Sequence, residues 1–303
     1  MNKKSLLRRA IDQRYLLVLL LPGLLYFVIF KYVPMYGIII AFKDYDFMRG
    51  IQNSAWVGFK YFKEFFQSPY CFRLIKNTFL LSAVNLVFGF PIPIIFALLL
   101  NELKSAKLKK VTQTASYLPY FLSTVVVIGI LQQLVSPSSG VINAIRNMMG
   151  KESIHFFMEK QYFIPMYVIT DIWQNTGYNA IVYISALSGI DMALYEAARI
   201  DGAGRWRCLW NITIPELTPT ISILLILRLG HLMDVGYEKV LLMYNPSIYE
   251  TADIISTFVY RTGIKNANYS FAAAVGLMNA IVALILIILA NYCSNKLSGD
   301  GLW

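Results

Sequence analysis

Between two long apolar segments, the chain reads Glu196-Ala197-Ala198-Arg199-Ile200-Asp201-Gly202-Ala203 and continues to Ile212-Thr213-Ile214-Pro215. This composition predicts two short helices that meet at a glycine turn. Asp191 can cap the first helix, and Gly202 provides the backbone freedom that ends it. The second helix is expected over 205–213, and Pro215 is expected to end it.

Alanines beside a glycine turn make a slim surface that can enter a groove of another protein at close range. Charged neighbours such as Glu196 and Arg199 can fix the orientation of that surface. An amphipathic loop that lies on the membrane surface would have a similar composition. The residues alone therefore leave two interpretations, a docking element and an interfacial loop.

The order of these residues resembles the EAA loop of permease subunits in ATP-driven, binding-protein-dependent importers. The pattern is Glu-Ala-Ala, three residues, Gly, nine residues, Ile, one residue, a branched aliphatic residue and Pro, with Ile214 where the family usually has Leu. The resemblance implies that the loop over about 188–216 couples the chain to a separate ATPase. The implied coupling residues are Glu196, Ala197, Ala198, Asp201, Gly202, Ala203, Ile212 and Pro215.

The whole chain is predicted to be an all-α, polytopic membrane protein. Its 303 residues are 57% hydrophobic, against about 45–50% in soluble domains, and the mean hydropathy is +0.55. A helix of about 20 apolar residues crosses a bilayer of about 30 Å. Six segments are long enough to do so: 15–42, 78–100, 115–135, 162–187, 217–236 and 271–292.

The net charge of +10 reflects topology and membrane lipid rather than nucleic acid, because the basic residues are spread between the spans. By the positive-inside rule, the basic residues before the first span and those of the short loop over 104–110 face the cytoplasm. With six spans across a bacterial cytoplasmic membrane, both termini and the coupling loop then lie on its cytoplasmic side. Five residues break the rule on the outer side: Arg49, Lys60, Lys63, Arg73 and Lys76.

Two spans carry polar residues at helical spacing, where each charge at the membrane centre costs about 2.5–3.5 kcal/mol on insertion scales. They are Asp171, Gln174, Asn175 and Tyr178 in the fourth span, and Arg228, His231 and Asp234 in the fifth. These residues predict a translocation path or a subunit interface. An internal ion pair of Arg228 with Asp171 or Asp234 is the alternative.

No metal-ligand spacing, glycine-rich phosphate loop or activated nucleophile is present in the sequence. The chain is therefore predicted to be a transport subunit and not an enzyme, with no metal site and no cofactor of its own. ATP and Mg²⁺ are expected in the partner ATPase.

Further segments resemble the permeases of oligosaccharide and polysaccharide-fragment importers: 31–37, 42–45, 234–240, 244–246 and 250–254. The resemblance implies the type I import fold, with a five-helix permease core over 78–293. Residues 1–77 form the cytoplasmic start, first span and first outer loop, and 294–303 form a cytoplasmic tail. The implied partners are a second homologous permease, two nucleotide-binding subunits, an external solute-binding lipoprotein and an oligosaccharide.

Other functions remain open at this point. The cargo could be a monosaccharide or a non-sugar solute. The chain could instead be a proton-coupled secondary transporter of a small polar solute, with Asp171, His231 and Asp234 as its relay. A membrane scaffold or sensor would need no polar stripe inside the membrane.

Overall fold

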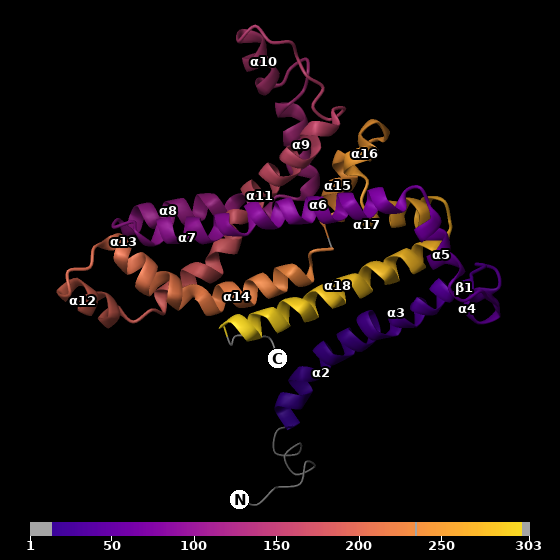
Figure 1. Ribbon diagram of the computed structural model, residues 1–303, viewed down its shortest axis with the longest axis horizontal. Helices are drawn as coiled ribbons and strands as arrows, with labels where there is room; N and C mark the ends of the chain where they lie inside the picture. The colour runs from indigo at the N-terminus through magenta and orange to yellow at the C-terminus, as the bar shows by residue number, and fades with distance from the viewer. Residues whose placement is uncertain (1–13, 234, 299–303) are drawn as a thin grey trace, which may run out of the picture.

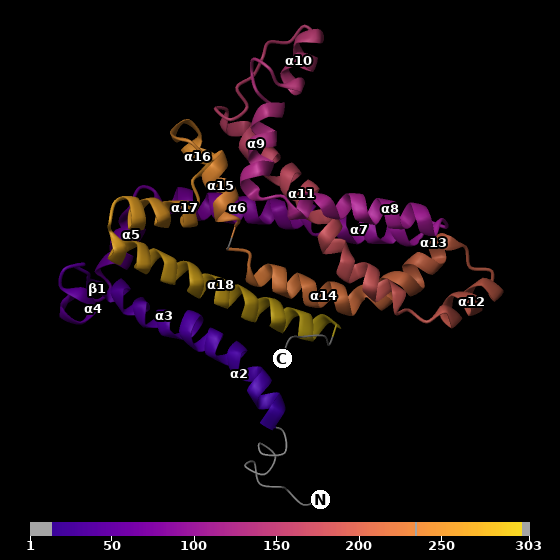
Figure 2. The same cartoon turned by 180° about the vertical axis from the view of Figure 1, so that it is seen from behind.

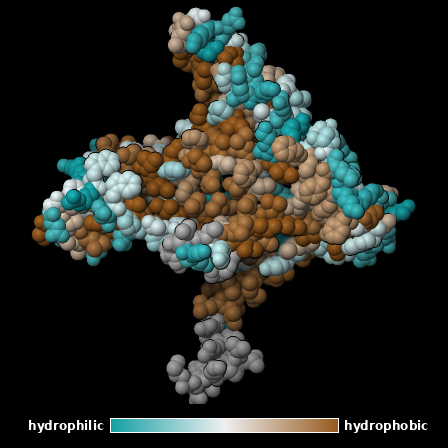
Figure 3. All heavy atoms as spheres, in the orientation of Figure 1, coloured by the Kyte–Doolittle hydropathy of each residue, from teal (hydrophilic) through white to brown (hydrophobic). Residues whose placement is uncertain are grey.

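The computed structural model describes residues 14–233 and 235–298, and within these ranges the chain is a bundle of long helices (Figure 1). Two short strands, β1 (Lys43–Asp44) and β2 (Ala55–Trp56), pair antiparallel at one end of the bundle. The predicted all-α fold is confirmed. Figure 3 shows apolar side chains covering much of the bundle, with hydrophilic surface concentrated toward its extremities.

Four helical segments are long and apolar enough to cross a membrane: Arg14–Phe42, Cys71–Asn101, Arg205–Gly230 and Tyr269–Tyr292. Two further pairs of helices qualify only when each bent pair is taken as one span. They are Ala106–Phe121 with Thr124–Leu134, and Lys160–Ser188 with Met192–Ile200. Counted in this way, the spans of the described chain number six, as predicted.

The first three spans are divided where the sequence interrupts regular hydrogen bonding. The first contains α2 (Arg14–Phe27), the π-helical turn η1 (Val28–Tyr32), α3 (Val33–Met35) and the 3₁₀ helix η2 (Tyr36–Phe42). The second contains α6 (Cys71–Gly89) and α7 (Pro91–Asn101). The third contains α8 (Ala106–Tyr117), the 3₁₀ turn η3 (Leu118–Phe121) and α9 (Thr124–Leu134).

The fourth, fifth and sixth spans are each built around one long helix. The fourth is α11 (Lys160–Ser188), followed by α12 (Met192–Ile200). The fifth contains α13 (Arg205–Cys208), the π-helical turn η4 (Leu209–Thr213) and α14 (Ile214–Gly230), and the sixth is α18 (Tyr269–Ser298). Short helices fill the connections: α4 (Gly50–Asn53), α5 (Lys60–Gln67), α10 (Val141–Met148), α15 (Tyr237–Met243), η5 (Pro246–Ile248), α16 (Tyr249–Ala252), α17 (Ile255–Tyr260) and η6 (Arg261–Lys265).

The third span is not the single helix that its apolar run over 115–135 predicts, because the chain turns by 98° between η3 and α9. Pro119 opens the 3₁₀ turn, and Leu122 after it is extended. The Ser123 hydroxyl then caps α9 by accepting from the Val126 amide at 3.3 Å. A proline followed by a cap starts a new helix rather than continuing the old one.

The prediction that Pro215 ends the helix after the glycine turn is wrong. Pro215 lies in the first turn of α14, and helical structure runs without a break from Arg205 to Gly230. The wider π-helical turn η4 precedes it, so the missing N–H of Pro215 falls at the junction between the π-helical and α-helical hydrogen-bonding patterns, and the helix continues through the proline. The fifth span therefore begins at the glycine turn itself.

The first span has little contact with the rest of the chain. None of its most apolar 18-residue window is buried, and its packing against α18 runs through η2, where Ala41 is fully buried. Both ribbon views show α2 diverging from α18 (Figure 2). A span with this much exposed apolar surface needs lipid or another protein around it.

Gly177 sets the distance between α11 and α8. A Cβ atom at this position would lie 2.1 Å from the carbonyl oxygen of Ser116. The two helix backbones are therefore in direct contact, and only glycine permits that approach. The packing fixes α11, which carries most of the candidate cavity described below.

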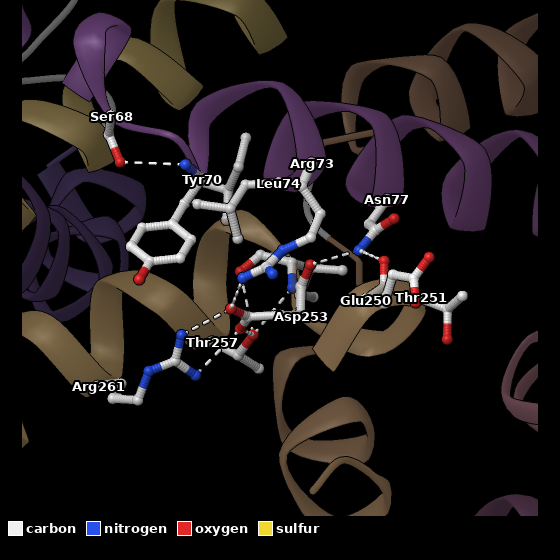
Figure 4. Close-up of polar contacts among 12 residues, drawn as sticks. Ser68, Tyr70, Arg73, Leu74, Asn77, Glu250, Thr251, Asp253, Thr257 and Arg261 are labelled. Carbon is white, nitrogen blue, oxygen red and sulfur yellow. Dashed lines mark hydrogen bonds and ion pairs between the residues drawn. The ribbon is translucent and has the colours of Figure 1, made fainter. Parts of the chain in front are cut away.

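A buried charge cluster joins α6 to the segment after α16 (Figure 4). The carboxylate of Asp253 has no exposed surface, and Arg261 donates to both of its oxygens, at 3.1 and 2.6 Å. Thr257 donates to it at 3.0 Å, and Nη2 of Arg73 lies 3.7 Å away. Asn77 of α6 donates to the backbone carbonyls of Glu250 and Asp253, both at 3.0 Å. The cluster therefore holds α17 against the start of α6.

Candidate functional site

A polar cavity system lies between α11, α14 and α15, with Asp171 at its centre. Three cavities of about 320, 210 and 440 Å³ all have Asp171 in their walls. Arg228 and His231 line the first two, and Lys239 lines the third. The structure thus brings together residues that the sequence placed on two separate spans.

Asp171 faces two cations from different elements. Its Oδ1 lies 3.6 Å from Nζ of Lys239, and its Oδ2 lies 4.0 Å from Nη2 of Arg228. Asn175, one turn further along α11, donates to Oδ1 at 3.0 Å. The predicted alternative, an ion pair between Arg228 and Asp171, is therefore present, and it lies inside the cavity rather than away from it.

Lys239 is the residue of this site that the sequence analysis missed. It is 5% exposed, its Nζ lies 5.0 Å from the ring centroid of Tyr167, and Nζ has no hydrogen-bond partner among the described residues. Burial in α15, outside the apolar spans, lowers the pKa of Lys239 to about 8, and Asp171 opposes that shift. Nothing in the local sequence distinguishes it from an ordinary surface lysine.

The other predicted path residues line the same cavities. Tyr178 stacks on Tyr120 with ring centroids 3.7 Å apart and an interplanar angle of 3°. Gln174 lies in the third cavity and donates to the Leu122 carbonyl at 3.0 Å. His231 follows directly after α14. The prediction for Asp234 lies outside the described residues.

The second candidate site is the elbow, which we define as residues 191–213. Asp191 caps α12 by accepting from the Ala193 amide at 2.9 Å, as predicted. Gly202 has a φ of +77°, and the amides of Gly202 and Ala203 donate to the Arg199 and Ala198 carbonyls at 3.0 and 2.8 Å. This is the Schellman pattern of a helix that ends at a glycine.

The elbow is tied to the fifth span and presents apolar side chains outward. The hydroxyls of Tyr195 and Thr213 lie 2.9 Å apart, which links α12 to η4. Ile200 is 87% exposed, and Trp206 and Trp210 of the same elbow are exposed as well. Glu196, Ala197, Asp201 and Pro215 are also exposed, whereas Ala198, Ala203 and Ile212 are partly covered. Tyr195 and Ile200 were not singled out from the sequence, although Ile200 is the most exposed large apolar residue of the elbow.

Residues 14–233 and 235–298 contain no group of three or more His, Cys, Asp or Glu side chains that could hold a metal ion. A hydrogen-bonding cavity inside an apolar bundle can instead hold a polar solute, because its charged and amide groups replace the solvation that the solute loses. The fold and this site define a polytopic membrane protein of the transport class.

The chain belongs to the family of binding-protein-dependent transport system inner membrane components, whose profile matches residues 77–298. It is 44% identical over 302 residues to the polygalacturonan/rhamnogalacturonan transport system permease protein YteP of Bacillus subtilis (strain 168), covering 100% of this chain and 94% of that one. Protein LplB of the same organism is 46% identical over 290 residues, covering 96% and 91%.

Among solved structures, the chain is similar to a subunit of a bacterial ABC transporter involved in the import of the acidic polysaccharide alginate. The TM-score is 0.89 at 42% identity, covering 97% of this chain and 100% of that one. An alginate ABC transporter in complex with an alginate pentasaccharide-bound periplasmic protein gives a TM-score of 0.90 at 41% identity, covering 99% and 100%. The predicted type I importer permease fold is confirmed.

Proposed function

We propose that this chain is the permease subunit of an ATP-driven importer that carries oligosaccharides or polysaccharide fragments across the bacterial cytoplasmic membrane. The observation that carries the proposal is the full-length similarity to YteP and to the alginate transporter subunit. A cavity lined by carboxylate, amide, phenol and guanidinium groups supports it, because such groups hydrogen-bond to sugar hydroxyls. Membership of a binding-protein-dependent family weighs against the proton-coupled alternative.

In this proposal the elbow couples the permease to a separate ATPase subunit, which binds ATP and Mg²⁺. The exposed surface of α12 and its C-terminal end supports that role, since Glu196, Ile200 and Asp201 are all exposed. ATP-driven movement of the ATPase shifts the permease between inward- and outward-facing states. Each state must bind its ligands differently, because a ligand with equal affinity for both shifts nothing.

The assembly proposed for the transporter contains two permeases, two nucleotide-binding ATPase subunits and an external solute-binding lipoprotein. One chain provides half of the path. The exposed first span and the cavities that open at the surface of a single chain support a second, homologous permease beside it. In the alginate transporter structure, a periplasmic protein carries the pentasaccharide.

The proposed orientation has both termini and the elbow in the cytoplasm and β1, α5 and α10 outside. In this orientation we divide the chain into three parts. They are the cytoplasmic start, first span and first outer loop over 1–77, a five-helix core over 78–293 and a cytoplasmic tail over 294–303. The cluster of lysines around α8 supports this orientation, because positively charged loops stay on the cytoplasmic side.

Purification of the tagged chain in mild detergent tests the assembly. We expect a second permease and an ATPase subunit to co-purify, and the reconstituted complex to take up an oligosaccharide only with ATP inside the vesicle. Uptake that persists without the ATPase and collapses when a protonophore is added would refute the proposal. An elbow that reacts with a membrane-impermeant reagent from outside the cell would refute the orientation.

A further inference from the structure

A separate polar pocket of about 590 Å³ lies at the end of the bundle that carries the elbow. Its walls are the turn between α7 and α8, part of α12 and the start of the fifth span. Both ribbon views place α7, α8, α12 and α13 at this same end (Figure 1 and Figure 2). Its volume falls within the range of about 300–1,000 Å³ that is typical of ligand sites.

The pocket is lined by more cations than acids. Lys104, Arg199 and Arg205 are the cations, and Glu102 is the one carboxylate among the described residues of its wall. All four side chains are exposed, and the ion pairs within 4.0 Å in the described chain involve other residues. A concave surface lined mainly by one sign of charge attracts ligands of the opposite sign. The pocket therefore favours an anion.

The pocket lies at the depth of the lipid headgroups. Asn101 is the last residue of the second span and Arg205 is the first residue of the fifth, and both line the pocket. Trp206 and Trp210 are exposed at the start of the fifth span, and tryptophan is enriched at the membrane–water interface. Basic pockets between membrane-spanning helices at the cytoplasmic side are typical sites for anionic headgroups.

The pocket uses a different face of α12 from the one that carries the coupling glutamate. Met192, Tyr195 and Arg199 line the pocket, and their spacings of three and four place them on one helix face. Glu196 is exposed and does not line it. Of the coupling residues that the sequence implies, only Ala203 is in its wall. A ligand in the pocket and an ATPase on the exposed surface of α12 therefore contact largely separate residues.

We propose that this pocket binds the phosphate headgroup of an anionic phospholipid, such as phosphatidylglycerol, from the cytoplasmic leaflet. Lys104, Arg199 and Arg205 provide the positive charge, and Leu103 and Leu209 provide apolar surface for the rest of the lipid. Phosphatidylcholine has the same phosphate but carries a positive choline, which the cations repel. The inference takes only the orientation of the chain from the proposed function, and it is independent of the cargo.

The test uses the full chain, purified in a neutral detergent with the subunits that co-purify. Native mass spectrometry counts bound lipid during titration with phosphatidylglycerol or phosphatidylcholine. The midpoint temperature of heat denaturation is measured with each lipid and with inorganic phosphate. The double variant Lys104→Gln/Arg205→Gln removes two exposed cations of the pocket. The matched control, Lys107→Gln/Lys110→Gln, removes two exposed charges of α8 that do not line it.

We expect phosphatidylglycerol to bind more tightly than phosphatidylcholine and to raise the midpoint temperature, because a ligand that binds the folded state stabilises it. The Lys104→Gln/Arg205→Gln variant should bind phosphatidylglycerol about thirtyfold more weakly, or roughly fivefold for each basic residue lost. The control should change the affinity by less than about twofold, because salt screens charges over about 8 Å.

Equal losses in the two double variants would assign binding to the diffuse charge of this surface and overturn the inference. Equal affinity for the two lipids would also overturn it. Equal stabilisation by inorganic phosphate would assign the pocket to a soluble anion, and lipid that binds only after the ATPase subunits are removed would assign it to the ATPase. Each of these results leaves the proposed function standing, which fails instead if the reconstituted complex takes up no oligosaccharide.

Discussion

Replacing Asp253 by asparagine tests whether the buried charge cluster holds α17 against α6. The substitution keeps the shape of the side chain and removes its charge. Arg261, which now donates to both carboxylate oxygens, and Arg73, 3.7 Å away, would then share a neutral amide. Two cations would face each other across a buried position that no longer carries a negative charge.

The expected loss of stability follows from the burial of the cluster. Breaking a buried ion pair by removing one partner costs about 3–5 kcal/mol, because the remaining charge stays desolvated. The side chains of Arg261 and Arg73 are 23% and 31% exposed, so water reaches part of each guanidinium. We therefore expect Asp253→Asn to lower the free energy of unfolding by about 3 kcal/mol, the lower end of that range.

The measurement is heat denaturation of the purified complex in detergent, followed by size-exclusion chromatography of the surviving fraction. Glu250→Gln is the matched control, because Glu250 forms an ion pair of similar length, 2.7 Å from Lys160, on the exposed surface three residues away. Exposed ion pairs contribute little. We expect the midpoint temperature of denaturation to fall clearly in Asp253→Asn and to stay almost unchanged in Glu250→Gln.

Arg261→Lys should fall between these two, because it keeps the charge and loses the two-donor geometry. Equal midpoints for Asp253→Asn and Glu250→Gln would refute the reasoning, since distance alone would then predict the stability better than burial does. An unchanged midpoint in Asp253→Asn would show that the cluster does not hold the helices together.

Three other predictions concern α11, α9 and the elbow. Gly177→Ala forces a Cβ atom to within 2.1 Å of the Ser116 carbonyl and should lower stability in the same heat assay, by about 1–3 kcal/mol. Gly129→Ala, in α9 with open space around it, should raise stability by about 0.5–1 kcal/mol; a loss there would contradict the argument from space. Glu196→Lys should abolish uptake while the protein stays in the membrane, whereas Glu152→Lys, the same charge change near α10, should leave uptake normal. Equal uptake in both variants would refute the coupling role.

The features that the sequence predicted correctly are those set by neighbours in the chain. The cap by Asp191 and the stop at Gly202 depend on hydrogen bonds that span two to five residues. The apolar spans depend on composition over about 20 residues. Such local rules act in the same way whatever surrounds them, so the sequence alone is sufficient to apply them.

The features that the sequence did not predict depend on contacts between distant segments. Asp253 meets Arg73 across 180 positions, and Lys239 meets Asp171 across 68. None of these four residues has an unusual local sequence. Each pair matters because other elements of the fold bury its charges. The prediction for Pro215 was wrong for a related reason, because the π-helical turn η4 that precedes it lets the helix continue through the proline.

The two candidate sites are joined by a single element. Asp171 lies within α11, and the elbow begins just after that helix ends at Ser188, about 25 Å further along at 1.5 Å per residue. Contact with α8 at Gly177 keeps this part of α11 from bending freely. The two cations that face Asp171 lie on α15 and α14, not on α11. We therefore expect a movement of the elbow that tilts α11 to change the distances from Asp171 to Lys239 and Arg228. Force applied at one end of the helix would then reach the charged groups of the cavity.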